Sequence, residues 1–197
     1  MEAFFQAYQE RLFRVTHRRS WHDVSTLARA LLIGSRENRQ VFLCGNGGSA
    51  GNAMHLANDF LYGVRRGLGK GLRVEALTAN SAVLTCLAND VGYEEIFSYQ
   101  LQEKGNPGDI LLVLSGSGNS INVIRALEVG NEIDMKTFAI LGYSGGRCKE
   151  LAHHPIHFEI DDMQIAEDLQ LIVGHMCMQW LCESGNKNKE FGVKQGS

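Results

Sequence analysis

The chain has 197 residues, within the usual range for one domain, and its 44% hydrophobic and 21% charged residues are ordinary for a globular protein in water. A net charge of -3 gives no reason to expect nucleic acid as a main partner, and no apolar run approaches the roughly 18 residues that span a bilayer. The five cysteines form no CxxC pair, which is typical of reduced thiols, so we expect a cytoplasmic protein without a membrane partner.

Two amphipathic helices are predicted ahead of the first strand. In residues 1–16, apolar side chains such as Phe4 and Tyr8 recur at helical spacing, with polar residues between them. Ser20 is suited to cap a second helix that begins one residue later. We expect this helical pair, residues 1–37, to cover a sheet or to dock on another subunit.

A glycine-rich turn follows the first predicted strand. The apolar run at residues 41–44 has the length of a buried strand, and residues 45–49 include three glycines that let a ligand approach the backbone. The helix predicted at residues 50–62 would point its N-terminus into this turn, which makes an anion site. On that helix, His55 and Asp59 share a face, which suits metal ligation, an acid–base pair or a surface hydrogen bond.

Short apolar runs alternate with helical segments along the rest of the chain. This alternation predicts an α/β protein whose parallel sheet is covered by helices on both faces. The predicted strands are at residues 73–77, 110–114, 137–141 and 156–160, and the predicted helices are at residues 80–89, 94–103, 121–130 and 163–182. We expect one domain, with an α/β core at residues 38–183 and a polar, flexible tail at residues 184–197.

A second loop of glycines and serines, residues 115–120, also follows a buried strand. Strand-to-helix loops of a parallel sheet share one edge, where such sheets bind ligands. Ser120 could alternatively serve only as the N-cap of the next helix. Two such loops favour a phosphate-bearing ligand, although neither fits the Walker or the dinucleotide-binding pattern.

The last predicted helix carries Glu167 and His175. Their eight-residue separation corresponds to a rise of about 12 Å, so one ion could bind both only if both side chains were stretched. We therefore expect Glu167 or His175 to serve the site of a neighbouring subunit. The alternatives are a solvated carboxylate for Glu167 and a hydrogen-bonded core histidine for His175.

Four stretches of the sequence carry a family resemblance. They are GNGGSAGNAMH (residues 45–55), LANDVGYEEIFS (residues 87–98), LSGSGNS (residues 114–120) and LGYSGG (residues 141–146). Together they resemble the sugar isomerase (SIS) domain family, and within it most closely the sedoheptulose 7-phosphate isomerases, also called phosphoheptose isomerases. The resemblance covers nearly the whole chain, and the combined motifs are specific although each loop alone is not.

The resemblance implies a fold, a reaction and an assembly. The fold is a three-layer, flavodoxin-like doubly wound α/β sandwich with a five-stranded parallel sheet, preceded by two helices. The reaction converts sedoheptulose 7-phosphate to D-glycero-D-manno-heptose 7-phosphate, the first step towards the heptose of bacterial surface polysaccharides. The implied assembly is a homotetramer with active sites between subunits.

The resemblance also implies the site residues. One zinc ion per active site would bind at the positions that are here His55, Asp59, Glu167 and His175. Asp59, Glu167 and His175 would be the catalytic residues. The implied substrate contacts are Asn46, Gly47, Gly48, Ser49, Asp90, Ser115, Gly116, Ser117, Ser120 and Glu167.

This chain departs from the family pattern at several of these positions. The family's general base, a Glu, is here Asp59, and the family's Gln ligand is here Glu167. Two carboxylates and two neutral imidazoles would neutralise Zn²⁺ and weaken its Lewis acidity, and either carboxylate could be the base. Gly116 stands where a hydroxyl residue is common, and Gln164 stands where typical members have Asp.

Our hypothesis is an isomerase that moves a proton between C1 and C2 through an enediol. Asp59 or Glu167 would exchange protons together with His175, while the serine loops hold the remote phosphate and so fix the reacting carbons. The alternatives are an isomerase of a different sugar phosphate and a non-catalytic SIS protein that binds the replication initiator or a sugar phosphate. Such binders usually lack the complete metal quartet, so four plausible ligands favour the enzyme.

Overall fold

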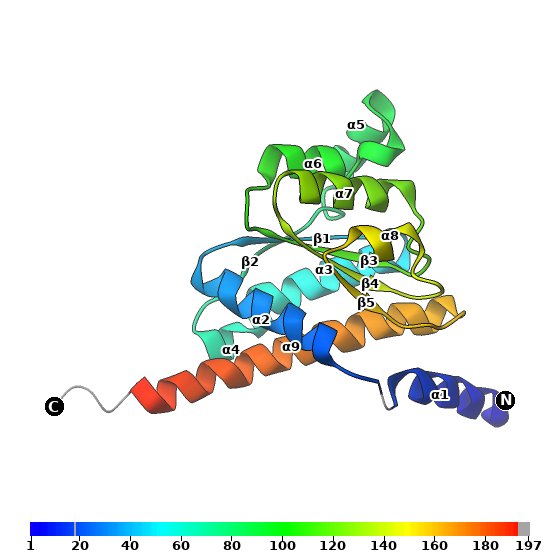
Figure 1. Cartoon of the computed structure of the whole chain (residues 1–197), viewed down its shortest axis with the longest axis vertical. Helices are drawn as coiled ribbons and strands as arrows, with labels where there is room; N and C mark the ends of the chain where they lie inside the picture. The colour runs from blue at the N-terminus through cyan, green and yellow to red at the C-terminus, as the bar shows by residue number, and fades with distance from the viewer. Residues whose placement is uncertain (18, 193–197) are drawn as a thin grey trace.

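Five parallel strands form one sheet between two layers of helices (Figure 1). The computed structural model describes residues 1–17 and 19–192, and the surroundings of side chains up to residue 185. The strands, in the order β2-β1-β3-β4-β5, are β2 (Arg73–Ala76), β1 (Gln40–Cys44), β3 (Ile110–Ser115), β4 (Lys136–Leu141) and β5 (His154–His157). This order is that of the flavodoxin-like doubly wound fold, so the predicted fold class is confirmed.

The two layers of helices cover opposite faces of the sheet. Successive strand residues such as Phe42 and Leu43 point to different faces, and both are fully buried. One layer contains α2 (His22–Arg36), α3 (Gly48–Asn58), α4 (Arg65–Leu68) and α9 (Met163–Gly192). The other contains α5 (Ser81–Asp90), α6 (Ser98–Lys104), α7 (Ile121–Glu132) and α8 (Gly146–Leu151).

The first helix, α1 (Glu2–Thr16), extends away from the body of the molecule and contains no fully buried residue (Figure 1). Its side chains Tyr8, Leu12 and Val15 pack against the core, and two polar contacts attach it to residues at and just before the beginning of α9. The hydroxyl of Tyr8 donates to Asp168 Oδ2 at 2.5 Å, and Arg11 Nη2 lies 3.1 Å from Asp162 Oδ2. Of the two predicted N-terminal helices, α2 therefore covers the sheet, whereas α1 presents an apolar surface to solvent.

Three predicted boundaries are wrong. The helix expected at residues 94–103 is divided into a 3-10 turn (Tyr93–Glu95) and α6, which begins only at Ser98. The last helix was expected to end near residue 182, but α9 continues to Gly192. At Gly185 it still packs closely on α4, because a Cβ there would overlap the backbone of Gly67. Residues 193–197 of the expected tail lie outside the described part of the chain. The last strand begins and ends earlier than predicted, because its pairing with β4 runs from His154 to His157.

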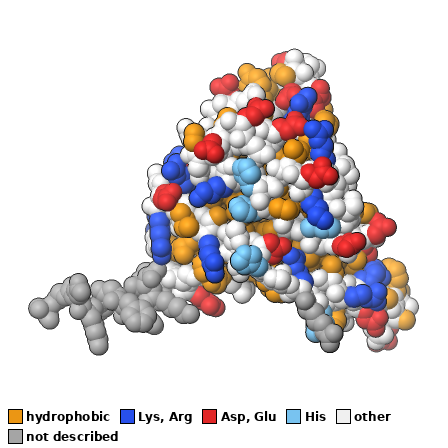
Figure 2. Space-filling view, viewed as in Figure 1, with side chains coloured by type: hydrophobic (Ala, Val, Ile, Leu, Met, Phe, Trp, Pro, Cys, Tyr) orange, Lys and Arg blue, Asp and Glu red, His pale blue; other side chains and the backbone are white. Residues whose placement is uncertain are grey.

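The surface carries charges of both signs. On the face shown in Figure 2, acidic and basic side chains are interspersed over the helices. In the part of the chain that the structure describes, no helix has both the length and the apolar character needed to cross a membrane.

Strands β1 and β3 are neighbours, paired from Val41 with Ile110 to Cys44 with Val113. The chain enters one Gly/Ser loop directly after each of these strands. The two loops therefore lie side by side at the point where the strand order reverses, which is the usual ligand-binding crevice of such sheets.

Candidate active site

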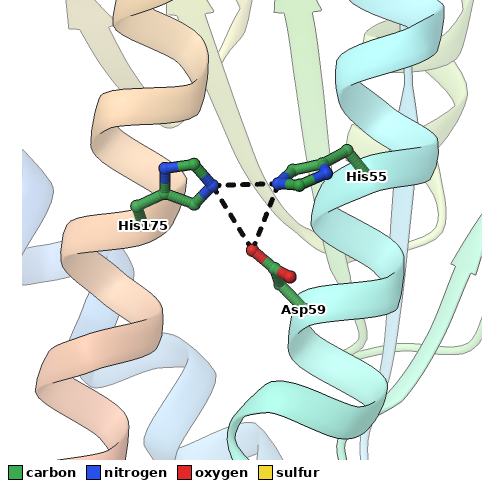
Figure 3. Close-up of side chains that lie close together, drawn as sticks. All are labelled: His55, Asp59 and His175. Atoms are coloured by element: carbon green, nitrogen blue, oxygen red, sulfur yellow. Dashed lines mark hydrogen bonds and ion pairs between the residues drawn. The ribbon is translucent and has the colours of Figure 1, made fainter.

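Three side chains with metal-binding atoms meet between α3 and α9 (Figure 3). The Nε2 atoms of His55 and His175 lie 2.9 Å apart, and Oδ2 of Asp59 lies 3.4 Å from each of them. The structure thus brings together three of the four predicted metal ligands. All three come from one chain, so His175 faces the cluster of its own subunit.

The local backbone explains why Asp59 faces His55. The two residues are one helical turn apart, and the helix changes its winding at Asp59, where a π-helical turn (Asp59–Gly63) begins. In this turn the amide of Val64 donates to the carbonyl of Asp59 at 3.1 Å. Single π-helical turns are frequent at functional sites because they re-aim side chains within an otherwise regular helix.

A glycine in α9 lets that helix approach α3 closely at the level of the cluster. Gly174 precedes His175, and a Cβ at this position would overlap the side chain of Leu56, which follows His55. The glycine therefore permits the short distance between the two imidazoles.

The donor set fits a divalent cation such as zinc. Two imidazole nitrogens and one carboxylate oxygen form the ligand set of several catalytic zinc sites, which keep a fourth position open. Tetrahedral bonds of about 2.0–2.1 Å place neighbouring ligand atoms about 3.3 Å apart. The two nitrogen–oxygen separations of 3.4 Å match this spacing, and the two imidazole nitrogens, 2.9 Å apart, would have to separate slightly around an ion. The imidazole side chains are 48% and 42% exposed, so a substrate can reach the remaining position.

Glu167, the fourth predicted ligand, lies apart from the cluster. Its carboxylate contacts Gly48 at the N-terminus of α3, where a Cβ would overlap it. This position is about 12 Å along the helix from His175 and next to the positive end of the α3 dipole. Glu167 therefore faces the first glycine loop.

The first glycine loop lines a pocket of about 280 Å³ together with α5 and the 3-10 turn Tyr93–Glu95. Asn46 and Gly47, two of the predicted substrate contacts, belong to its wall. The side-chain amides of Asn46 and Asn122 exchange two hydrogen bonds, of 2.8 and 2.9 Å, and the hydroxyl of Tyr93 donates to Asn46 Oδ1 at 3.1 Å. Asn46 is thus held in one orientation.

The second loop holds its backbone in place with its own serines. Ser115 Oγ accepts a hydrogen bond from the amide of Gly118 at 3.0 Å, and Ser117 Oγ accepts one from Asn119 at 3.3 Å. Ser120 occupies the N-cap position of α7, but its side chain makes no capping hydrogen bond. Its hydroxyl is consequently available to a ligand at the helix N-terminus.

Ser49 and Gly116 were predicted to contact the substrate, but both are buried against other parts of the protein. Ser49 is only 4% exposed, and its Oγ accepts a hydrogen bond from Gln170 Nε2 at 2.9 Å. Gly116 is buried, and a Cβ there would overlap Met163 at the start of α9. A hydroxyl residue at position 116 would require that methionine to move.

Asp90 lies at the exposed end of α5, where it accepts hydrogen bonds from Cys86 at 3.4 Å and from Asn89 at 2.7 Å. The hydrogen bond to Asp90 raises the pKa of the Cys86 thiol. Burial raises the pKa of Cys177, two residues after His175, to about 12. These thiols therefore stay protonated at neutral pH.

Sequence reasoning missed three polar residues of this region, namely Tyr93, Asn122 and Gln170. Asn122 and Gln170 are almost fully buried and hydrogen-bonded to loop or helix residues. The available signal was a polar residue on an otherwise apolar helix face, because such residues are buried only when they find partners. Tyr93 carried no comparable signal.

Comparisons with known proteins add to this geometry. The family model for the SIS domain matches residues 3–142, which is more than half of the chain. The chain belongs to the SIS domain family. The matched part of this SIS protein includes both glycine loops, His55 and Asp59, and it ends before the helix that carries His175.

Relatives of this SIS protein have a consistent name. A phosphoheptose isomerase from Akkermansia muciniphila is 36% identical over 156 residues, which cover 78% of this chain and 81% of the relative. A phosphoheptose isomerase from Helicobacter pylori strain P12 is 38% identical over 149 residues, which cover 74% and 76%. The resemblance to phosphoheptose isomerases is thus confirmed.

Solved structures agree with this SIS assignment. The phosphoheptose isomerase of Neisseria gonorrhoeae superposes with a TM-score of 0.82 at 26% identity, covering 91% of this chain and 97% of that chain. The phosphoheptose isomerase of Francisella tularensis has a TM-score of 0.84 at 24% identity, covering 92% and 96%, which shows the shared fold.

Proposed function

We propose that this SIS protein is an aldose–ketose isomerase that converts D-sedoheptulose 7-phosphate to D-glycero-D-manno-heptose 7-phosphate. The product is a precursor of the heptose in bacterial surface polysaccharides. The observation that carries the proposal is the convergence of His55, Asp59 and His175 between α9 and the helix that follows the first phosphate-type loop. The curated phosphoheptose isomerases at 36% and 38% identity support the same reaction.

His55, Asp59 and His175 would hold one zinc ion. When bound, the ion would supply Lewis acidity that polarises the substrate carbonyl. With Glu167 at Gly48, the cluster contributes one negative charge, so the ion would retain net positive charge. The protein would contribute three ligand atoms at fixed positions and would leave one side of the ion open to the substrate.

Proton transfer between C1 and C2 requires a base near the carbon acid and an acid near the oxygens. Two carboxylates are candidates for the base: Asp59, whose Oδ2 faces the imidazoles, and Glu167 beside the first loop. His175 is the proposed partner in the exchange. Asp59→Asn and Glu167→Gln separate the candidates, because loss of kcat with metal binding retained identifies the base.

The phosphate end is proposed to bind the second loop. Ser117 and Ser120 present hydroxyls at the N-terminus of α7, whose dipole favours an anion. Ala166 of α9 lies against Gly116 of this loop, and α9 continues from there past Glu167 towards His175. A sugar phosphate lying along α9 would therefore present its other end to the carboxylates and the cluster.

We propose a homotetramer in the cytoplasm, with active sites between subunits. The exposed aromatic side chains of Phe4, Phe5 and Phe13 on α1 support an association that covers them. The metal cluster is open to solvent on one side, which supports an active site that a neighbouring subunit completes. The five free cysteines support a reducing compartment.

The test is turnover of sedoheptulose 7-phosphate by purified protein, measured as prepared, after removal of divalent metal and after addition of zinc. Loss on removal and recovery with zinc would support both the reaction and the metal. Activity that is indifferent to metal would keep the reaction and reject the metal. Absence of turnover in every arm, with folded protein, would point to another sugar phosphate or to a binding protein.

A further inference from the structure

A buried polar cluster links α3 to α9 at positions that precede the proposed metal ligands in both helices. Gln170 Nε2 donates to Ser49 Oγ at 2.9 Å, and Asn52 Nδ2 donates to Gln170 Oε1 at 2.9 Å. Asn52 Nδ2 also lies 3.0 Å from the carbonyl oxygen of Glu167. One residue of α9, Gln170, thus binds two successive turns of α3.

The burial of this cluster indicates that it does more than hold the helices together. Gln170 is 1% exposed and Ser49 is 4% exposed. Apolar side chains of the same size would bury as well without needing partners, whereas a buried amide is costly unless its hydrogen bonds are made. Because those bonds form at one relative position of the two helices, the cluster selects that position.

The two helices run side by side in the same direction. Along them, Ser49 meets Gln170, Leu56 meets Gly174, and Gly63 meets Met178. The packing contacts are apolar, and apolar contacts tolerate a shift of register better than hydrogen bonds do. A slip by one helical turn, about 5.4 Å, would move His175 out of reach of His55.

We propose that Gln170 is a positioning residue that sets the register of α9 against α3, and through it the affinity of the His55–Asp59–His175 cluster for a divalent cation. The inference rests on the metal site of the proposed function. It also gives Ser49 a role other than substrate contact: its hydroxyl fastens α3 to the helix that carries His175.

The experiment compares Gln170→Met with Gln100→Met. Methionine nearly preserves the volume of glutamine and removes its hydrogen bonds. Gln100 is a matched control, because it is 4% exposed and donates to the carbonyls of Leu77 and Ile96 in the opposite layer. Zinc affinity is measured by competition with a chromophoric chelator, and the stability of each metal-free protein is measured by urea unfolding.

We expect both substitutions to lower the stability of the metal-free protein. Only Gln170→Met should weaken zinc binding, by about tenfold or more, which is the effect of replacing residues that orient metal ligands. If Gln170→Met does not fold, Ser49→Ala removes the same hydrogen bond without adding bulk and must weaken zinc binding in the same direction. If the folded variant binds zinc with the same affinity as the wild type, the inference about Gln170 is wrong while the proposed metal site stands. A wild-type protein that binds no zinc would overturn the metal site of the proposed function as well.

Discussion

The Nε2 atoms of His55 and His175 lie 2.9 Å apart although 120 residues separate them in the sequence. The contact joins the helix after the first strand to the last helix of the chain. Both imidazoles are partly exposed, so the pair contributes little to the buried core. The two imidazoles can therefore be replaced without unfolding the protein.

Replacement of His175 by alanine is expected to abolish most of the activity. Loss of the proposed metal ligand and proton carrier should lower kcat by about 10²–10⁴-fold, whereas a half-exposed side chain should change stability by only about 0.5 kcal/mol. Turnover and thermal unfolding of the purified variant measure the two effects. His22→Ala, at the exposed start of α2, is the matched control, and an unchanged rate in His175→Ala would remove this residue from the mechanism.

Ser120→Ala separates ligand binding from helix capping. Because the Ser120 side chain makes no capping hydrogen bond, its loss should leave stability unchanged while KM for the sugar phosphate rises about tenfold or more, as for a lost hydrogen bond to a charged group. Asn80 does cap α5, accepting from the amide of Val83 at 3.2 Å. Asn80→Ala should therefore cost about 1 kcal/mol of stability without raising KM. The opposite pattern would make Ser120 a structural cap.

Gly48→Ala tests the place of Glu167. The added Cβ would displace the flexible Glu167 carboxylate from the N-terminus of α3, so kcat/KM should fall. Stability should hold or rise, because alanine favours a helix over glycine by about 1 kcal/mol. Gly51→Ala, one turn along the same helix with open space around its Cβ, should stabilise equally and leave kcat/KM unchanged. Equal kinetics of the two variants would show that the position of Glu167 does not matter for the reaction.

The attachment of α1 should weaken in alkaline solution. Burial, and then the hydrogen bond and charge of Asp168, raise the pKa of Tyr8 from 10.0 to about 12. The protonated form is thus favoured in the folded state, so its stabilising contribution is complete below pH 10 and is lost as the pH rises towards 12. Tyr8→Phe should remove this part of the pH dependence, measured as urea unfolding between pH 9 and 12. Identical pH profiles of wild type and variant would contradict the assignment.

Much of the fold was predictable because it depends on local patterns. The apolar run at residues 110–114 and the glycines after it define a buried strand and its loop without reference to the rest of the chain. The end of α9 was not predictable in this way. Residues 183–192 have no apolar pattern, and the close contact of Gly185 with Gly67 is a tertiary feature.

The candidate site was predictable as residues but not as an arrangement. The spacing of His55 and Asp59 placed them on one face, and the family resemblance added Glu167 and His175. The sequence could not show that α9 runs alongside α3, which brings His175 to the pair and Glu167 to Gly48 instead. The polar contacts of Gln170 were equally hidden, because they depend on the packing of two distant helices.

The late position of α9 in the chain gives the order of events during synthesis. Ribosomes add roughly 5–20 residues per second, and the N-terminal part of a domain can begin to fold while the rest is being made. A nascent chain can pair β1 with β3 and form both glycine loops before His175 has been translated. It cannot yet bring together the three ligands proposed for the cation, so under this proposal loading of the metal follows release of the C-terminal helix from the ribosome. Chains that terminate before this helix would lack His175 and also the apolar side chains that α9 contributes to the core, among them Ile165 and Leu169.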